Sequence, residues 1–274
     1  DADLKQAAKT MGRRDARFFV DVYYQVQHFR IASAAQARTN AENAEPNRVL
    51  VWTFKQMETL ENNIRRALKE FADTYTVGLW LQSITGIGPV ISAGLLAHID
   101  IRKAPTFGHF WSFAGLNPTV KWEKKTKRPW NADLKCLVAF KAGESFVKVQ
   151  NNEDDYYGKL FRQRKDAEIA RNEAGGFKAD AVRILTEKKF NKDTDAYKAY
   201  SAGKLPPAHL HARARRYAVK IFLSHVHHAM FLDYYGKLPP NPYIFEHGVD
   251  HRHYLAPPNM PFEEYAKSLG DMAE

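Results

Sequence analysis

Two long stretches of helical hydrophobic spacing near the start of the chain limit its fold more than any other feature. In residues 12–42, large apolar side chains recur at intervals of three and four, and residues 47–75 show the same spacing. Pro46 stands between them, and proline is excluded from a helix interior but accepted near a helix start. We therefore predict two long helices that pack as an antiparallel hairpin through their apolar stripes.

The rest of the chain also favours helices, because the alternation of apolar and polar residues that marks strands is scarce. Residues 78–116 contain short apolar runs separated by glycine and proline, which predicts short helices joined by tight turns. Further helices are expected over much of 131–172, near 176–190 and over 207–235. The predicted fold class is mainly α, closed by an extended tail rich in proline.

This organisation divides the chain into four predicted segments. Residues 1–77 form the helical hairpin, a coiled-coil arm, and residues 78–150 form a helix-hairpin-helix domain that binds DNA. Residues 151–236 form a helical region, and residues 237–274 form the extended tail rich in proline and histidine.

Composition excludes several classes of protein. A hydrophobic content of 45% is too high for a disordered chain, and no apolar run approaches the ~20 residues of a membrane span. The single cysteine, Cys136, excludes a disulfide scaffold. We expect a protein of the cytoplasm, in a prokaryotic or phage-infected cell, associated with the nucleoid and not with a membrane.

Positive charge points to an anionic partner. The chain has 41 Lys and Arg against 31 Asp and Glu, a net charge of +10. The basic residues concentrate in residues 121–135, 159–171 and 211–220 rather than spreading evenly. Such clusters are typical of proteins that bind nucleic acid through its phosphates.

The segment LQSITGIGPVISAGLL, residues 81–96, is the sharpest motif and has the form of a helix-hairpin-helix. Gly86 and Gly88 permit backbone angles closed to other residues and let a phosphate approach the main chain. Pro89 suits the first turn of the next helix, whose bare N–H groups and dipole favour an anion. Ile87 would plug the turn into the core. An ordinary corner in a helical core is the structural alternative.

The predicted DNA contacts combine this turn with the basic clusters. They would grip the backbone with little sequence preference, because phosphates carry no base information. On the predicted helix 207–235, three of the basic residues share one face through their spacing of three and four. The predicted contacts are Gly86, Ile87, Gly88, Val90, Lys121, Lys124, Lys125, Lys127, Arg128, Arg213, Arg216 and Lys220.

Other residue groups leave alternatives open. Trp122 and Trp130 flank the basic stretch and either stack on unpaired bases or serve as ordinary aromatics. Late histidines, including His225 and His228, either bind a metal or pack a helix against the tail. The acidic run 153–155 reads as a solvated loop or a helix start. We expect no metal site and no cofactor, with magnesium required only for a nuclease or recombinase activity.

SITGIGPVISAGLLAHI, then FWSFAGLNP, then a basic stretch together resemble the C-terminal domain of the DEDD-type insertion-sequence transposases, which mobilise DNA with a bridge RNA. The resemblance covers residues 78–150 most firmly. It implies an all-helical domain, DNA contact through the hairpin, a coiled-coil arm and self-association. The stretch Phe110–Pro118 reads as a degenerate second copy of the hairpin motif.

The sequence departs from the family in two places. No ribonuclease-H-like alternation of strands and helices precedes residue 78. After the AGLNP stretch, where the family has a catalytic serine, the chain has Thr119 and Thr126, while Ser112 comes too early and Ser145 too late. Catalytic residues are therefore unassigned.

We expect a DNA-binding relative of these transposases without catalysis of its own, with structured RNA as a further partner left open. An active transposase, recombinase or structure-specific nuclease is one alternative. A non-enzymatic subunit of a phage or mobile-element assembly is another.

Overall fold

The computed structural model describes residues 2–41, 47–240 and 255–260, and in these ranges the chain is mainly helical and contains no strand. This confirms the predicted fold class. The elements in chain order are α1 (Ala2–Lys9), α2 (Arg13–Ala41), α3 (Arg48–Asp73), α4 (Thr76–Ser83), α5 (Pro89–His98), the 3-10 helix η1 (Ile101–Lys103), α6 (Phe107–Phe113), α7 (Ala132–Lys135), the π-helix η2 (Cys136–Ala142), α8 (Gly143–Val149), α9 (Tyr157–Glu173), α10 (Lys178–Glu187), α11 (Asp195–Ser201) and α12 (Pro207–Tyr235).

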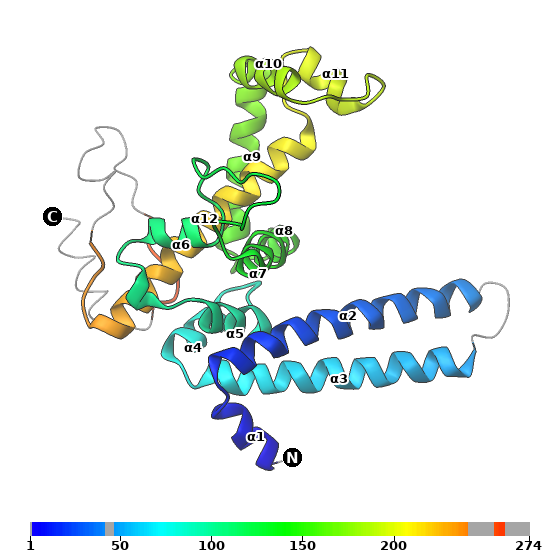
Figure 1. Cartoon of the computed structure of the whole chain (residues 1–274), viewed down its shortest axis with the longest axis vertical. Helices are drawn as coiled ribbons and strands as arrows, with labels where there is room; N and C mark the ends of the chain where they lie inside the picture. Colours follow the sequence, from blue (N-terminus) through cyan, green and yellow to red (C-terminus); the bar gives the residue numbers. More distant parts are fainter. Residues whose placement is uncertain (1, 42–46, 241–254, 261–274) are drawn as a thin grey trace.

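Helices α2 and α3 form the predicted antiparallel hairpin, which extends to one side of the molecule (Figure 1). The Asn47 side chain caps α3 by accepting a hydrogen bond from the Val49 amide at 2.9 Å. Between the helices, the buried carboxylate of Glu61 accepts a hydrogen bond from Gln27 and pairs with Arg30. A buried polar contact of this kind favours one register of the hairpin over others.

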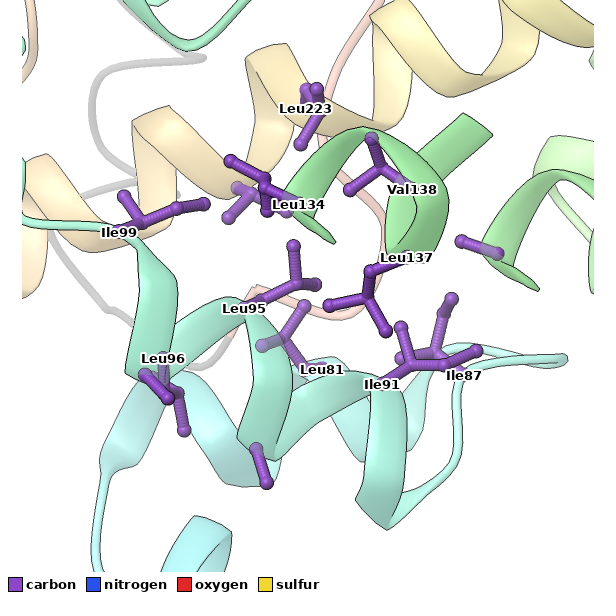
Figure 2. Packing of buried hydrophobic residues seen from close by; sticks show 14 of the residues in the cluster. Leu81, Ile87, Ile91, Leu95, Leu96, Ile99, Leu134, Leu137, Val138 and Leu223 are labelled. Carbon is purple, nitrogen blue, oxygen red and sulfur yellow. The ribbon is translucent and has the colours of Figure 1, made fainter. Parts of the chain in front are cut away.

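Helices α4 and α5 follow the hairpin and are joined by a short turn at residues 84–88. Eight of the ten residues of α5 are buried, so this helix lies inside the molecule. Figure 2 shows Leu81 and Leu95 facing Leu134 of α7 and Leu137 of η2. Gly94 permits the close approach, since a methyl group there would lie 2.5 Å from the Leu137 side chain.

Helix α12 connects two regions of the molecule. Its C-terminal half joins the large core that also includes α2, α3, α4 and α5. Its N-terminal end belongs to a smaller cluster that includes Phe177, Ile184 and Tyr200, at the end where α10 and α11 lie (Figure 1). The large core therefore draws on the first three predicted segments, and the four-part division of the chain stays a prediction.

A short piece of the tail, residues 255–260, packs against the helical body. The Trp80 indole donates to the Pro258 carbonyl at 2.8 Å, and the Asn259 amide group donates to the Ser83 carbonyl at 3.1 Å. These contacts agree with a tail that lies over the helices. The rest of the predicted tail beyond residue 240 falls outside the described residues.

His225 joins this tail segment to α12. Its Nε2 lies 2.7 Å from the Leu255 carbonyl oxygen and its Nδ1 lies 2.8 Å from the Tyr157 hydroxyl. A carbonyl only accepts, so Nε2 carries the proton and Nδ1 accepts from Tyr157. The structure thus confirms the interpretation in which a late histidine packs α12 against the tail.

Acid is expected to destabilise the protein through this histidine. Burial, and secondarily the neighbouring His228, lower the pKa of His225 to about 4, although the hydrogen bond to Leu255 opposes the shift. A histidine with a lowered folded-state pKa contributes stability that is complete above its unfolded pKa of ~6.5 and is lost as pH falls toward about 4. Protonation of His225 near pH 4 is expected to lower the free energy of unfolding by about 2–3 kcal/mol.

Urea unfolding between pH 7 and pH 4, with wild type and His225→Gln in parallel, measures this loss. His228 has its pKa lowered to about 4 by burial and by His227, so part of the acid sensitivity persists in the variant. Identical pH profiles for the two proteins would contradict the assignment to His225.

Candidate nucleic-acid interface

The turn between α4 and α5 has the backbone geometry that its glycines predict. Gly86 has φ +93°, in the left-handed region, and the Ser145 hydroxyl donates to its carbonyl. Gly88 is extended and partly exposed, and a methyl group there would meet no atom within 4 Å. The Ile87 side chain is 3% exposed and its amide donates to the Ile84 carbonyl at 2.9 Å. Ile87 is therefore the internal plug of the turn, with no free amide for DNA.

The other N–H groups at this turn have no hydrogen-bond acceptor among the described residues. Among the described residues, none accepts a hydrogen bond from the amides of Gly86, Gly88, Val90 or Ile91. The first bonded amide of α5 belongs to Ser92, which donates to the Gly88 carbonyl at 3.0 Å. Bare amides at a helix start, added to the helix dipole, favour a bound anion.

Charge near this turn is mixed rather than positive. The Thr85 hydroxyl donates to the Asp154 carbonyl, and Glu153 and Asp154 are exposed beside it. Lys159 donates to the Glu153 carbonyl from α9. Asp155 is buried and accepts from the Gly158 amide at 2.9 Å, so the acidic run begins α9, one of its two predicted roles.

Residues 117–130, which we call the basic loop, connect α6 to α7. The Asn131 amide donates to the Phe113 carbonyl at 2.9 Å and closes its base. Inside the loop, the Trp122 indole donates to the Thr126 carbonyl and Arg128 lies over the Trp122 ring. All of the predicted cations in the loop are exposed, namely Lys121, Lys124, Lys125, Lys127 and Arg128.

The basic loop also corrects one expectation. A second hairpin motif over Phe110–Pro118 requires a helix to begin near Pro118, and the chain has no helix between Phe113 and Ala132. Gly115 instead turns the chain with φ +63°, and the Trp130 ring packs against it. The second-copy interpretation is therefore wrong.

A cleft of about 670 Å³, which we call the basic cleft, lies between the base of the basic loop, η2, α9 and α12. Its lining includes six cationic side chains and one carboxylate, Glu168. The cations are Lys135, Arg164, Arg213, Arg215, Arg216 and Lys220. Segments far apart in the sequence thus supply one strongly positive concave surface.

Three of these cations have carboxylate partners. The buried Glu168 carboxylate accepts from Arg213 at 2.7 Å and pairs with Arg164 at 2.6 Å. Arg215 pairs with Glu144 beside the cleft. Arg213 therefore has a carboxylate partner within the protein, and its role as a DNA contact stays a prediction. Arg216 and Lys220, which follow on α12, have no such carboxylate partner among the described residues.

Arg216, Lys220 and Lys135 have no carboxylate within ion-pair distance among the described residues. Burial lowers the pKa of Arg216, and the guanidiniums of Arg213 and Arg215 lower it further. Burial also lowers the pKa of Lys220, and Arg216 lowers it further. An anion in the cleft would relieve this repulsion.

The turn and the basic cleft are separated by one short helix. Gly143, the first residue of α8, lies against Arg215, and Val149, its last residue, lies against Gly86. Seven helical residues span about 10 Å. The structure brings Arg216 and Lys220 together with the basic loop, and it leaves the turn outside the cleft.

In the sequence, Lys135, Arg164 and Arg215 stand out only as members of the basic clusters. The three side chains meet in one cleft because α7, α9 and α12 lie together in the fold. The only sign of this basic surface in the sequence is the clusters at 121–135, 159–171 and 211–220.

The described residues contain no group of three or more His, Cys, Asp or Glu placed to hold a metal ion. His227 donates to the Ala104 carbonyl at 2.8 Å, a packing role like that of His225. The late histidines His247, His251 and His253 lie outside the described residues. Across the described helices, none is both long and apolar enough to cross a membrane.

Comparison with known proteins identifies one segment. Residues 79–128 match the family model of the transposase IS116/IS110/IS902 family. This segment includes most of α4, the turn, α5, α6 and most of the basic loop. Searches of curated proteins and of solved structures gave no match. The match supports a relationship between this chain and that transposase family.

Proposed function

We propose that this chain binds DNA through its phosphate backbone as a transposase-like protein, without a reaction of its own. The observation that carries the proposal is the charge imbalance of the basic cleft, six cations against one carboxylate. The family match supports it, because the matched segment supplies one wall of this cleft. Contacts of this kind provide affinity without sequence readout.

Each part of the interface has a distinct role in this proposal. Arg216 and Lys220 would neutralise phosphates at the cleft, and the exposed lysines of the basic loop would add contacts beside it. The amides of Gly88 and Val90 would hold one further phosphate at the start of α5.

The salt dependence of duplex binding tests this function. An electrophoretic shift series with unrelated duplex sequences should show similar affinities that fall steeply with salt, with a log–log slope of about −0.9 for each neutralised phosphate. An affinity insensitive to salt, or no binding at moderate salt, would contradict the proposal. A structured RNA in the same series tests whether RNA is also a partner.

Replacing Gly88 with Leu tests the contribution of the turn. The extended backbone and the open space at Gly88 accept a side chain, which would stand in front of the α5 amides. We expect unchanged thermal stability and duplex binding weakened about tenfold or more for all sequences, since charge-assisted hydrogen bonds contribute ~1.5–3 kcal/mol. Gly108→Leu, in the first turn of α6, is the control. Loss confined to one DNA sequence would indicate base readout instead.

A catalytic role is the second candidate, favoured by the family match. Ser145 donates its hydroxyl to the Gly86 carbonyl and the Ser112 hydroxyl accepts from Asn117 at 3.1 Å, and neither hydroxyl is hydrogen-bonded to a histidine or a carboxylate among the described residues. Incubation with magnesium and supercoiled or branched DNA separates the candidates. Cleavage would overturn the proposal of binding without chemistry.

Self-association through the hairpin is a further part of the proposal. Phe18, Phe29, Val49 and Trp52 on α2 and α3 are exposed, and aliphatic and aromatic side chains in such numbers favour a partner helix. A second copy of the chain would supply matching apolar faces. Sedimentation of the whole chain tests this, and a monomer at high concentration would contradict it.

A further inference from the structure

The basic cleft is lined by aromatic rings as well as by cations. Trp130, Phe140 and Tyr217 all face it, and each ring lies against a different cation. The Lys135 ammonium is 4.3 Å from the Trp130 ring centre, and the guanidinium carbons of Arg215 and Arg164 are 5.3 Å and 5.0 Å from those of Phe140 and Tyr217. Rings and guanidinium planes are the surfaces on which unpaired bases stack.

The most accessible of these rings is presented by an unusual helix. Phe140 lies in the π-helix η2, and its side chain is 51% exposed while Val138 and Ala142 are fully buried. π-helices are rare and occur frequently at functional sites. A large exposed ring beside guanidiniums is poorly explained by packing alone, and it is well suited to stack on a ligand.

Polar groups at the cleft also lack partners. Among the described residues, the Nε atoms of Arg164 and Arg215 are buried and make no hydrogen bond. Arg216 is exposed and Lys220 is half-buried at the cleft, and neither has a carboxylate within ion-pair distance among these residues. An anionic ligand beside Arg216 and Lys220 would reduce the repulsion between the neighbouring positive charges of the cleft.

The size of the cleft limits what it can hold. A volume of about 670 Å³ falls in the range of ~300–1,000 Å³ that is typical of small-molecule sites. One or two nucleotides fit such a space, whereas a base-paired duplex does not enter it. A duplex phosphate can reach the exposed Arg216 and the basic loop from outside, but no base of a duplex enters the cleft.

We propose that the basic cleft binds one or two unpaired nucleotides of a polynucleotide strand, with phosphate on Arg216 and Lys220 and a base stacked on Phe140. This inference rests on the proposed nucleic-acid binding and specifies the substrate class of the same site. It predicts that single strands, or duplexes with unpaired ends, gain contacts that a fully paired duplex cannot make.

The test uses fluorescence anisotropy of the whole chain with labelled oligo(dT), oligo(U) and a duplex of equal length. Phe140→Ala should weaken oligo(dT) or oligo(U) binding at least about fivefold, since stacking contributes ~1–3 kcal/mol per base. Duplex binding should change less than about twofold, because the bases inside a duplex are already stacked on one another. Phe140→Trp should retain strand binding, and Phe18→Ala, an exposed ring on the hairpin, is the control.

A charge-matched pair tests the phosphate contacts. Arg216→Gln with Lys220→Gln should weaken strand binding much more than Lys189→Gln with Lys192→Gln, which removes the same charge from an exposed segment. Equal losses from both pairs would mean a general charge effect and would overturn the cleft assignment. Thermal denaturation checks that each variant folds.

The remaining outcomes separate this inference from the proposed function. Absence of binding to every probe at moderate salt would overturn both. Salt-dependent duplex binding, together with strand binding that Phe140→Ala leaves unchanged, would overturn the cleft inference alone. A preference for oligo(U) or for oligo(dT) that Phe140→Ala removes would support the inference and identify the source of the strand as RNA or DNA.

Discussion

Replacing Glu168 with Gln is expected to lower the free energy of unfolding by about 3–5 kcal/mol. The Glu168 side chain is 2% exposed and lies between two guanidiniums, at 2.7 Å from Arg213 and 2.6 Å from Arg164. Burial alone would raise the pKa of Glu168, but the hydrogen bond and charge of Arg213, aided by Arg164, outweigh it and lower the pKa. The neutral variant would leave two partly buried cations without their counter-charge.

The lowered pKa of Glu168 makes the stability of the protein fall as the pH falls. A carboxyl with a lowered folded-state pKa contributes stability that is complete above its unfolded pKa of 4.5 and is lost as pH falls below it. Urea unfolding of wild type and Glu168→Gln should therefore differ most at neutral pH and converge in acid.

Glu173→Gln is the matched control, because Glu173 is exposed on the same helix and pairs with Lys204. An exposed pair contributes ~0–1 kcal/mol, so this variant should remain close to wild type. Equal losses from the two variants would contradict the role given to Glu168.

Replacing Gly78 with Ala is expected to destabilise the protein by about 3 kcal/mol or more, although it adds only a methyl group. That group would lie 2.0 Å from the Ala72 carbonyl oxygen and 3.1 Å from the Leu96 side chain. The carbonyl oxygen belongs to the backbone at the end of α3, so it cannot move aside as a flexible side chain would. The start of α4 would have to separate from α3.

Gly88→Ala is the comparison, since a methyl group at that position meets no atom within 4 Å. Thermal denaturation of the two variants measures the difference, and the Gly88 variant should match wild type. A Gly78→Ala protein as stable as wild type would show that α3 and α4 are not in this close contact.

Helix boundaries were the part of the fold most accessible to prediction. The spacing of apolar residues predicted hairpin helices over 12–42 and 47–75, and the structure has them at Arg13–Ala41 and Arg48–Asp73. The helix predicted over 207–235 is α12, Pro207–Tyr235, in which proline suits the first turn and Gly236 ends the helix with φ +63°. These signals are local, so they can be read without knowing the fold.

The π-helix and the basic loop were not predictable in the same way. Cys136–Ala142 is a π-helix whose buried residues pack into the core with residues of α5 and α12, and no feature of its sequence predicted the widened turn. The stretch after Phe113 resembled a second hairpin motif, but the contact of Trp130 with Gly115 closes it as a loop. In the basic loop, a contact between residues far apart in the sequence outweighed the local pattern.

By itself, the sequence determined the long hairpin, the turn at Gly86 and Gly88, the basic clusters and the start of α12. These follow from periodicity and from the backbone freedom of glycine and proline, which act within a few residues. Only the tertiary structure decided which cations remain available to a ligand. Arg213, Arg216 and Lys220 share one helix face, yet only Arg213 meets a carboxylate, because the packing of α9 against α12 places Glu168 beside it. A charge is neutralised by what lies near it in space, and that depends on how the helices pack.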